Sequence, residues 1–216
     1  MSTHGYARAK KVAKSQTQSK ALVISHAKPH KKWDTEYLQI VSVDVGKKHY
    51  AIRCERRYTN GTTTPLVYEL YNIIENCEEK GMYTTLTIFL DTYYDIFSQS
   101  HVFVIEKQLS ENYIAVRLSQ HTLTYFLIKF TDNVYICEID ARVKSMMFGV
   151  KDLNSRGLKK WSVEKAKEIC LARGDEASYN VLERKTPKRD DLADTVTQLE
   201  GLLRYLESSM YVTYGV

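Results

Sequence analysis

Carboxylates that close apolar runs constrain the fold of this chain more than any other feature of its sequence. Four stretches carry such acids: residues 40–46, 102–106, 134–140 and 190–194. Two of them end β-branched runs with one carboxylate each, Asp44 and Glu106, and the last places three acids on one helical turn. A carboxylate at the end of a buried strand is costly unless something cationic gathers several of them. Since Asp and Glu oxygens suit Mg²⁺, we expect the fold to bring these acids together around a pair of divalent ions.

The bulk composition fits one soluble domain. At 216 residues the chain suits a single domain with or without a tail, and no run approaches the roughly 18 apolar residues of a membrane span. No signal-peptide pattern is present, so a soluble, intracellular protein without a membrane partner is expected. The four cysteines lack metal-ligand spacing, which favours buried free thiols over a zinc site.

The charge is distributed unevenly along the chain. Residues 1–32 hold eight Lys or Arg and no acid, whereas the remaining 184 hold 23 basic and 26 acidic residues. Three interpretations stay open: a solvated, disordered extension, an arm that binds a polyanion, or an organelle address. Lysine richness and weak amphipathicity count against the address. We therefore divide the chain into a basic, disordered extension at 1–34, a domain at 35–210 and a short tail at 211–216.

Hydrophobic periodicity predicts a mixed α/β layout. Strands are expected at 38–45, 49–58, 66–74, 101–106 and 133–139, with Asn60-Gly61 marking a hairpin between the second and third. Helical spacing covers 84–97 and 111–130, then 161–173 with Ser162 as its cap, and finally a helix opened by Pro187. Three hairpin strands followed by alternating strands and helices predict one sheet with helices packed on it.

The last helix does not present its acids equally. On a wheel of about 100° per residue, Asp191 lies roughly 90° from the centre of the leucine stripe and Asp194 roughly 150°. Asp190 is equally far round on the other side. This geometry favours Asp191 at a sheet edge, while a solvated acidic helix start is the alternative for all three.

In its ordered motifs the chain resembles the RuvC-type Holliday junction resolvases, closest to the branch found in poxviruses, related large DNA viruses and fungal mitochondria. The resemblance covers roughly residues 37–206. It is carried by Val-Asp-Val-Gly at 43–46, Ile-Glu-Lys-Gln at 105–108, Val-Lys at 143–144 with Gly149, and Lys-Arg-Asp-Asp-Leu-Ala-Asp at 188–194.

The resemblance implies a ribonuclease-H-like, five-stranded mixed sheet in the order 3-2-1-4-5, flanked by helices. It implies a homodimer that acts on branched DNA at a site of DNA replication, whether viral factory, nucleus or mitochondrion. Two Mg²⁺ ions per site, replaceable by Mn²⁺, would be held by the carboxylates of Asp44, Glu106, Asp191 and Asp194. Lys144 would contact a backbone phosphate. In the chemistry that we expect, Lys188, Arg189 and Lys144 are candidates for stabilising phosphate charge, with simple surface charge as the alternative for Arg189.

Two departures from the family pattern bear on DNA handling. Bacterial members carry a junction-opening aromatic residue three positions after the strand-end Glu, where this chain has Leu109 with Tyr113 nearby. The extended basic N-terminus is the second departure.

Three function classes remain: a junction-resolving endonuclease, another ribonuclease-H-like nuclease of transposase-like or RNA-cleaving type, and a non-catalytic DNA-binding or actin-like nucleotide-binding protein. The nucleotide binder lacks a second Gly-rich phosphate loop, and DNA binding alone leaves Glu106 unexplained. We therefore interpret the chain as a Mg²⁺-dependent crossover junction endodeoxyribonuclease.

Overall fold

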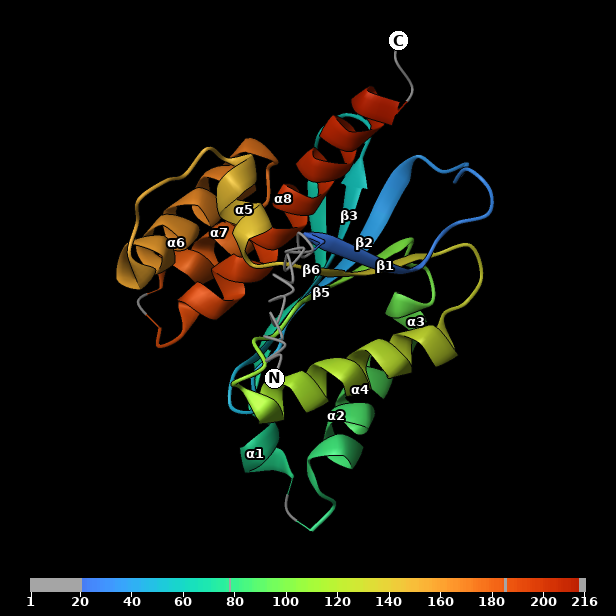
Figure 1. The fold of residues 1–216 in the computed structure, drawn as a ribbon, viewed down its shortest axis with the longest axis vertical. Helices are drawn as coiled ribbons and strands as arrows, with labels where there is room; N and C mark the ends of the chain where they lie inside the picture. Colours follow the sequence, from blue (N-terminus) through green and yellow to red (C-terminus); the bar gives the residue numbers. More distant parts are fainter. Residues whose placement is uncertain (1–20, 78, 185, 214–216) are drawn as a thin grey trace, which may run out of the picture.

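A six-stranded mixed sheet with helices on both faces forms the body of the protein. The computed structural model describes residues 21–77, 79–184 and 186–213 (Figure 1). The strands are β1 (Val23–Ala27), β2 (Tyr37–Asp44), β3 (Tyr50–Tyr58), β4 (Thr63–Tyr71), β5 (Val102–Glu106) and β6 (Tyr135–Ile139). The helices are α1 (Ile73–Asn76), α2 (Met82–Asp91), α3 (Tyr94–Phe97), α4 (Tyr113–Lys129), α5 (Arg142–Met147), α6 (Ser155–Ala172), α7 (Glu176–Glu183) and α8 (Arg189–Thr213).

The strand order confirms the predicted core of the sheet. The order is β1-β6-β5-β2-β3-β4, which contains the five expected strands in the expected sequence. The pairs β2–β3 and β3–β4 are antiparallel, while β5 lies parallel to both β2 and β6. The central strands β2 and β5 are covered on both faces, which explains their nearly continuous apolar runs.

The sixth strand, β1, was not expected. It pairs antiparallel with β6 at the edge of the sheet, and His26 Nε2 lies 2.9 Å from Glu138 Oε2. This strand falls inside the 1–34 segment that we expected to be disordered, so the later part of that segment belongs to the sheet. Residues 1–20, which carry five of the eight basic side chains, lie outside the described residues.

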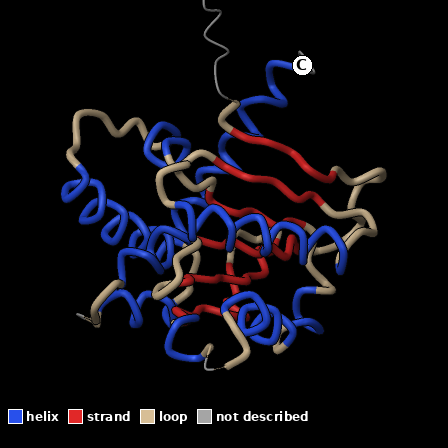
Figure 2. The backbone as a smooth tube through the Cα atoms, turned by 60° about the horizontal axis from the view of Figure 1, so that its bottom comes forward, coloured by secondary structure: helices blue, strands red, loops and turns tan. Residues whose placement is uncertain are grey.

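Different helices cover the two faces of the sheet. On one face α2 and α4 pack against an apolar and aromatic core, in which Phe103 stacks on Phe130. On the other face α8 runs along the sheet and buries Val196, Leu199 and Leu202. Helices α5, α6 and α7 then lie against α8 (Figure 1), and Figure 2 shows the strands enclosed between these two groups. No helix in the described part of the chain has the length and apolar character needed to cross a bilayer.

A buried charge network joins β3 to the helices above it. Arg53, only 1% exposed, contacts the carboxylate of Glu55 and also donates to Asp175 Oδ2 at 2.5 Å. Arg57 contacts Glu55 from the other side and donates to Glu200 Oε2 on α8 at 2.7 Å. Burial alone would raise the pKa of Glu55, but the two guanidinium groups lower that pKa to about 2. The strand is thereby tied to α7 and α8 through charges that have little access to water.

We expect Glu55→Gln to lower the free energy of unfolding at pH 7 by about 3 kcal/mol, because it leaves two buried guanidinium groups without their shared carboxylate. The folded pKa of Glu55 lies below its unfolded value, so its contribution is present above about pH 4.5 and is lost as the pH falls towards 2. Urea unfolding across this range should show a weaker acid dependence in the variant. The exposed control Glu207→Gln should change stability by less than about 0.5 kcal/mol; equal losses in both variants would contradict the role of the network.

Candidate active site at the ends of β2 and β5

Two carboxylates stand side by side where the central parallel strands end. Asp44 is the last residue of β2 and Glu106 the last of β5. Val43 pairs with Ile105 in the parallel register, so the next residue on each strand falls at the same level. Because side chains alternate along a strand, both carboxylates project to the same face of the sheet. Ser42, two residues before Asp44, contacts α8, so this is the face that α8 covers.

Buried polar contacts fix where α8 sits on that face. Ser42 Oγ donates to the carbonyl oxygen of Thr195 at 2.9 Å. The side-chain amide of Gln198 donates to Ser42 Oγ and to the carbonyl of Val43, both at 3.2 Å. All of these groups are buried, so sliding the helix along the strand would leave polar atoms without partners. The first turns of α8 are therefore held beside the end of β2.

Lys144 on α5 links the strand carboxylates to α8. Its Nζ lies 3.2 Å from Glu106 Oε2 and 2.9 Å from Asp194 Oδ2. The close approach of α5 to α8 depends on Gly201, since a Cβ there would lie 2.9 Å from the Cα of Lys144. One ammonium group thus touches carboxylates from two different elements.

Asp194 is oriented by a residue whose role the sequence did not reveal. Ser162 Oγ on α6 donates to Asp194 Oδ1 at 2.5 Å and lies 3.1 Å from Thr197 Oγ1. The predicted cap role of Ser162 is wrong: α6 begins at Ser155, and Asn154 accepts a hydrogen bond from the Gly157 amide at 2.8 Å. The helical wheel disfavoured Asp194 because we assumed that α8 packs against the sheet alone. In the structure α6 packs on the side of α8 that carries Asp194. Asn154 was the available signal for an earlier helix start.

The structure separates the other two acids of α8. Asp191 lines a cavity of about 270 Å³ together with Asp44, Gly46 and His49. Asp190 is turned instead to α6, where its Oδ2 lies 2.6 Å from Lys159 Nζ. Asp191 therefore shares a cavity with Asp44, while Asp190 has a cation of its own.

The other residues expected to handle DNA differ in exposure: Lys188 is exposed and Arg189 is half-buried. Lys188 stands immediately before α8 with a positive φ of 65°, and Arg189 donates to the carbonyl of Leu182 at 3.1 Å. Leu109 and Tyr113, in and just after the loop that follows Glu106, are 76% and 65% exposed.

The carboxylates raise one another's proton affinity. Burial, followed by the charges of Glu106 and Asp194, raises the pKa of Asp44 well above its usual value, and Lys144 only partly opposes this. Burial also raises the pKa of Glu106, although Lys144 again lowers it. The pKa of Asp191 is raised by burial and by Asp190. Burial lowers the pKa of Lys144, but Glu106, Asp194 and Asp44 more than compensate, so its ammonium stays charged. The cluster carries more negative charge than one lysine neutralises.

This donor set suits a hard divalent cation in its chemistry. In the described ranges no three Asp, Glu, His or Cys side chains are close enough to form a metal-binding group as they stand. The central position between Glu106 and Asp194 is taken by the ammonium of Lys144, which acts there as a stand-in cation. Carboxylate oxygens in excess of the local positive charge are what Mg²⁺ and Mn²⁺ prefer. The residues present therefore fit such an ion by donor type and by charge.

The raised pKa of Asp44 has a consequence for stability. Its stabilising contribution is present below the unfolded pKa of about 4 and is lost as the pH rises through the higher folded pKa. We expect Asp44→Asn to raise the free energy of unfolding at pH 8 by about 1–3 kcal/mol, because it removes a buried charge that lacks full compensation.

Urea unfolding with a chelator present should show this gain at pH 8 and a much smaller gain at pH 4. Asp132→Asn, in an exposed loop, is the matched control. An Asp44→Asn protein that is less stable than the parent at pH 8 would show that the carboxylate is well compensated.

Comparison with known proteins found relatives in sequence and solved structures with a similar fold. No family model matches the chain. It is 29% identical over 113 residues to the uncharacterized protein 97L of Invertebrate iridescent virus 3, covering 52% of each chain. It is 26% identical over 144 residues to the uncharacterized protein 170L of Invertebrate iridescent virus 6, covering 56% of this chain and 58% of the relative. The matches thus span little more than half the length of these curated relatives.

Solved structures match over more of the chain. The yeast mitochondrial Holliday junction resolvase Ydc2 has a TM-score of 0.58 at 16% identity, covering 84% of this chain and 87% of that one. The Fowlpox virus resolvase in complex with Holliday junction DNA has a TM-score of 0.55 at 20% identity, covering 79% and 98%. RuvC of Thermus thermophilus has a TM-score of 0.53 at 12% identity, covering 80% and 97%. The chain therefore has the ribonuclease-H-like α/β fold of the RuvC-type Holliday junction resolvases, with a sixth strand at the edge of its sheet.

Proposed function

We propose that this protein is a Mg²⁺-dependent, structure-selective endonuclease that resolves four-way DNA junctions by hydrolysing phosphodiester bonds. The observation that carries the proposal is the meeting of Asp44 and Glu106 at the ends of β2 and β5, with Lys144 and Asp194 directly beside them. The shared fold supports it, because the fold is that of enzymes named as junction resolvases.

The four carboxylates of Asp44, Glu106, Asp191 and Asp194 would hold the metal ions. Two bound Mg²⁺ ions would supply a hydroxide nucleophile at neutral pH and would stabilise negative charge on the leaving 3′ oxygen. Mn²⁺ should substitute, since it accepts the same oxygen ligands.

The protein's own groups would prepare the site for this chemistry. Lys144 stays protonated among the acids, so its ammonium is available to the negative charge of a backbone phosphate. Ser162 holds one oxygen of Asp194 and leaves the other towards Lys144. The contacts of Gln198 and Ser42 keep α8 in register, so the acids are positioned before a substrate arrives. Lys188 and Arg189 are further candidates for contact with DNA phosphates.

We further propose branched DNA and a second copy of this chain as its partners. The Fowlpox resolvase was solved with a Holliday junction, and a two-fold dimer would present two such centres to opposed strands of a symmetric junction. The expected place of action is the site of DNA replication. Leu109 at the position of the junction-opening aromatic favours one alternative, a ribonuclease-H-like nuclease with a different nucleic-acid substrate.

We expect the purified protein to cut a labelled four-way junction in the presence of Mg²⁺ and to lose this activity with a chelator. Asp44→Asn and Glu106→Gln should bind the junction but cut more than about 100-fold more slowly, since even outer-shell changes at metal sites cost about 10–100-fold. Asp132→Asn should cut normally. Normal cleavage by either active-site variant would show that the reaction occurs elsewhere.

Parallel assays with duplex, flap and RNA–DNA hybrid substrates separate the two nuclease classes. Preference for the junction supports resolution, whereas preference for a hybrid or duplex supports the alternative. Because Asp44→Asn is expected to be at least as stable as the parent, its loss of cleavage would not reflect unfolding.

A further inference from the structure

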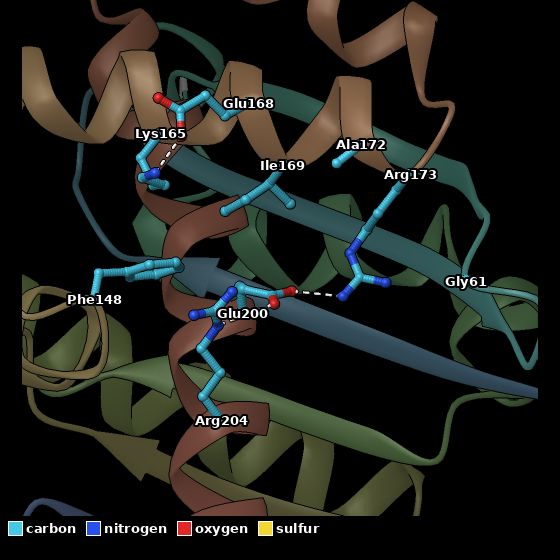
Figure 3. Close-up of a pocket in the computed structure, with 9 residues that line it drawn as sticks. All are labelled: Gly61, Phe148, Lys165, Glu168, Ile169, Ala172, Arg173, Glu200 and Arg204. Atoms are coloured by element: carbon cyan, nitrogen blue, oxygen red, sulfur yellow. Dashed lines mark hydrogen bonds and ion pairs between the residues drawn. The ribbon is translucent and has the colours of Figure 1, made fainter.

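A second cavity lies on the helical face, away from the carboxylates. It measures about 450 Å³ and opens between α6 and α8, next to Phe148 after α5 and to Gly61 at the β3–β4 turn (Figure 3). Arg204 follows Asp194 by ten residues on α8, so the cavity is about 15 Å along the helix from the active-site acids. Arg173, directly after α6, and Arg204 on α8 extend towards its centre, with the carboxylate of Glu200 between them (Figure 3).

Three guanidinium groups share the single carboxylate of Glu200. Its Oε2 accepts hydrogen bonds from Arg57 at 2.7 Å and from Arg173 at 2.9 Å, and its Oε1 accepts one from Arg204 at 3.2 Å. Burial would raise the pKa of Glu200, but Arg57 and Arg173 lower it below its usual value, so the carboxylate is ionised at neutral pH. One negative charge is thus surrounded by three positive ones.

The ion pairs connected to Glu200 do not neutralise this excess of positive charge. Arg57 also contacts Glu55, which is shared with Arg53, and Arg53 contacts Asp175. Within the described ranges this connected network holds four guanidinium groups and three carboxylates, Glu55, Asp175 and Glu200. Lys165, at the rim of the cavity, forms an ion pair with Glu168 and therefore adds no net positive charge. One positive charge therefore remains without a protein counterion.

Buried polar atoms without partners lie beside the same arginines. Arg57 is 7% exposed, and its Nη2 has no hydrogen-bond partner among the described residues; neither does the hydroxyl of Thr63. The two residues face each other across the β3–β4 ladder, and the Thr63 amide donates to the carbonyl of Arg173 at 3.0 Å. A buried donor without an acceptor is unfavourable, so the arginine cluster around Glu200 keeps hydrogen-bonding capacity that the described residues do not satisfy.

We propose that this cavity, the arginine pocket, is a binding site for a phosphate group. The side chains of Arg173 and Arg204 are 25% and 46% exposed, so their remaining N–H groups are accessible to a ligand. The guanidinium fork matches phosphate oxygens in two-point hydrogen bonds. Phe148 steadies the Arg204 guanidinium, whose central carbon lies 4.4 Å from the ring centroid.

The phosphate can come from two sources, a phosphodiester of nucleic acid or a free phosphate-bearing solute. If the source is DNA, the pocket would hold the backbone of an arm about 15 Å from the cutting site. The pocket's chemistry is independent of the nuclease proposal, because none of its residues belongs to the carboxylate cluster.

The test uses the full chain and inorganic phosphate at constant ionic strength, with chloride as the balancing anion. We expect a saturable rise in melting temperature and a dissociation constant measurable by calorimetry. Arg204→Gln should weaken phosphate binding by about tenfold, the loss expected for hydrogen bonds to a charged group. Arg204→Lys should recover part of the affinity, and Arg156→Gln, an exposed arginine at the start of α6, should retain all of it.

Arg204 is the chosen site because its side chain is the most exposed of the three around Glu200, and unfolding curves confirm that the variants fold. A phosphate response that is absent, or that Arg204→Gln leaves unchanged, overturns the pocket as a phosphate site.

A second experiment identifies the source of the phosphate. Binding of a four-way junction by the Asp44→Asn protein is measured against salt, with and without Arg204→Gln. A DNA phosphodiester in the pocket would lower the salt slope by about one upon substitution. An unchanged slope together with weakened inorganic phosphate binding assigns the pocket to a free solute. The readout is binding by a variant that does not cut, so failure of the nuclease proposal would leave these results interpretable.

Discussion

The packing of α8 against β2 is the constraint on which the site depends. Ser42, on the central strand, contacts the backbone of Thr195 and the side chain of Gln198 in a region closed to water. These bonds fix both the rotation and the translation of the helix, because either movement would leave buried polar groups without hydrogen-bond partners. The position of α8 in turn determines where its functional side chains lie. Asp191 and Asp194 come to the strand ends at its start, and Glu200 comes to the arginines further along.

The acidic cluster is a place where the fold gives up stability. A sheet that ended β2 and β5 in apolar or solvated residues would avoid the burial of charge, and the repulsion from nearby carboxylates, that raise the pKa of Asp44 and Glu106. The single ammonium of Lys144 offsets part of this repulsion, and Gly201 lets α5 approach closely enough to deliver it. Uncompensated charge that is held in place by buried hydrogen bonds elsewhere is typical of a functional site rather than of a structural one.

The sequence was informative where one local pattern decided the outcome. Apolar runs predicted β2 and β5 and their acidic ends, and Asn60-Gly61 predicted the hairpin, in which Gly61 has a φ of 88°. It was uninformative where two distant elements decided the outcome together. Strand β1 was not predicted because it lies in a lysine-rich segment, which we expected to be disordered. Its position in the sheet depends on pairing with β6. Asp194 was judged by the sheet alone, although its environment is made by α5 and α6, and Ser162 was assigned to a cap because its partner lies 32 residues away. Site residues could be named from spacing, but their contacts could not.

The same helix pair, α6 and α8, carries two imbalances of opposite sign. Near the start of α8, Lys144 faces the three carboxylates of Glu106, Asp194 and Asp44, and Asp190 has a separate partner in Lys159. Further along, Arg57, Arg173 and Arg204 surround Glu200. Each imbalance is costly in a low-dielectric setting, and each is relieved by an ion of the opposite charge. A divalent cation suits the first and a phosphate suits the second. A polyanion that carried its own cations to the strand ends would satisfy both at once, and the rigid α8 would set the distance between the two points of contact.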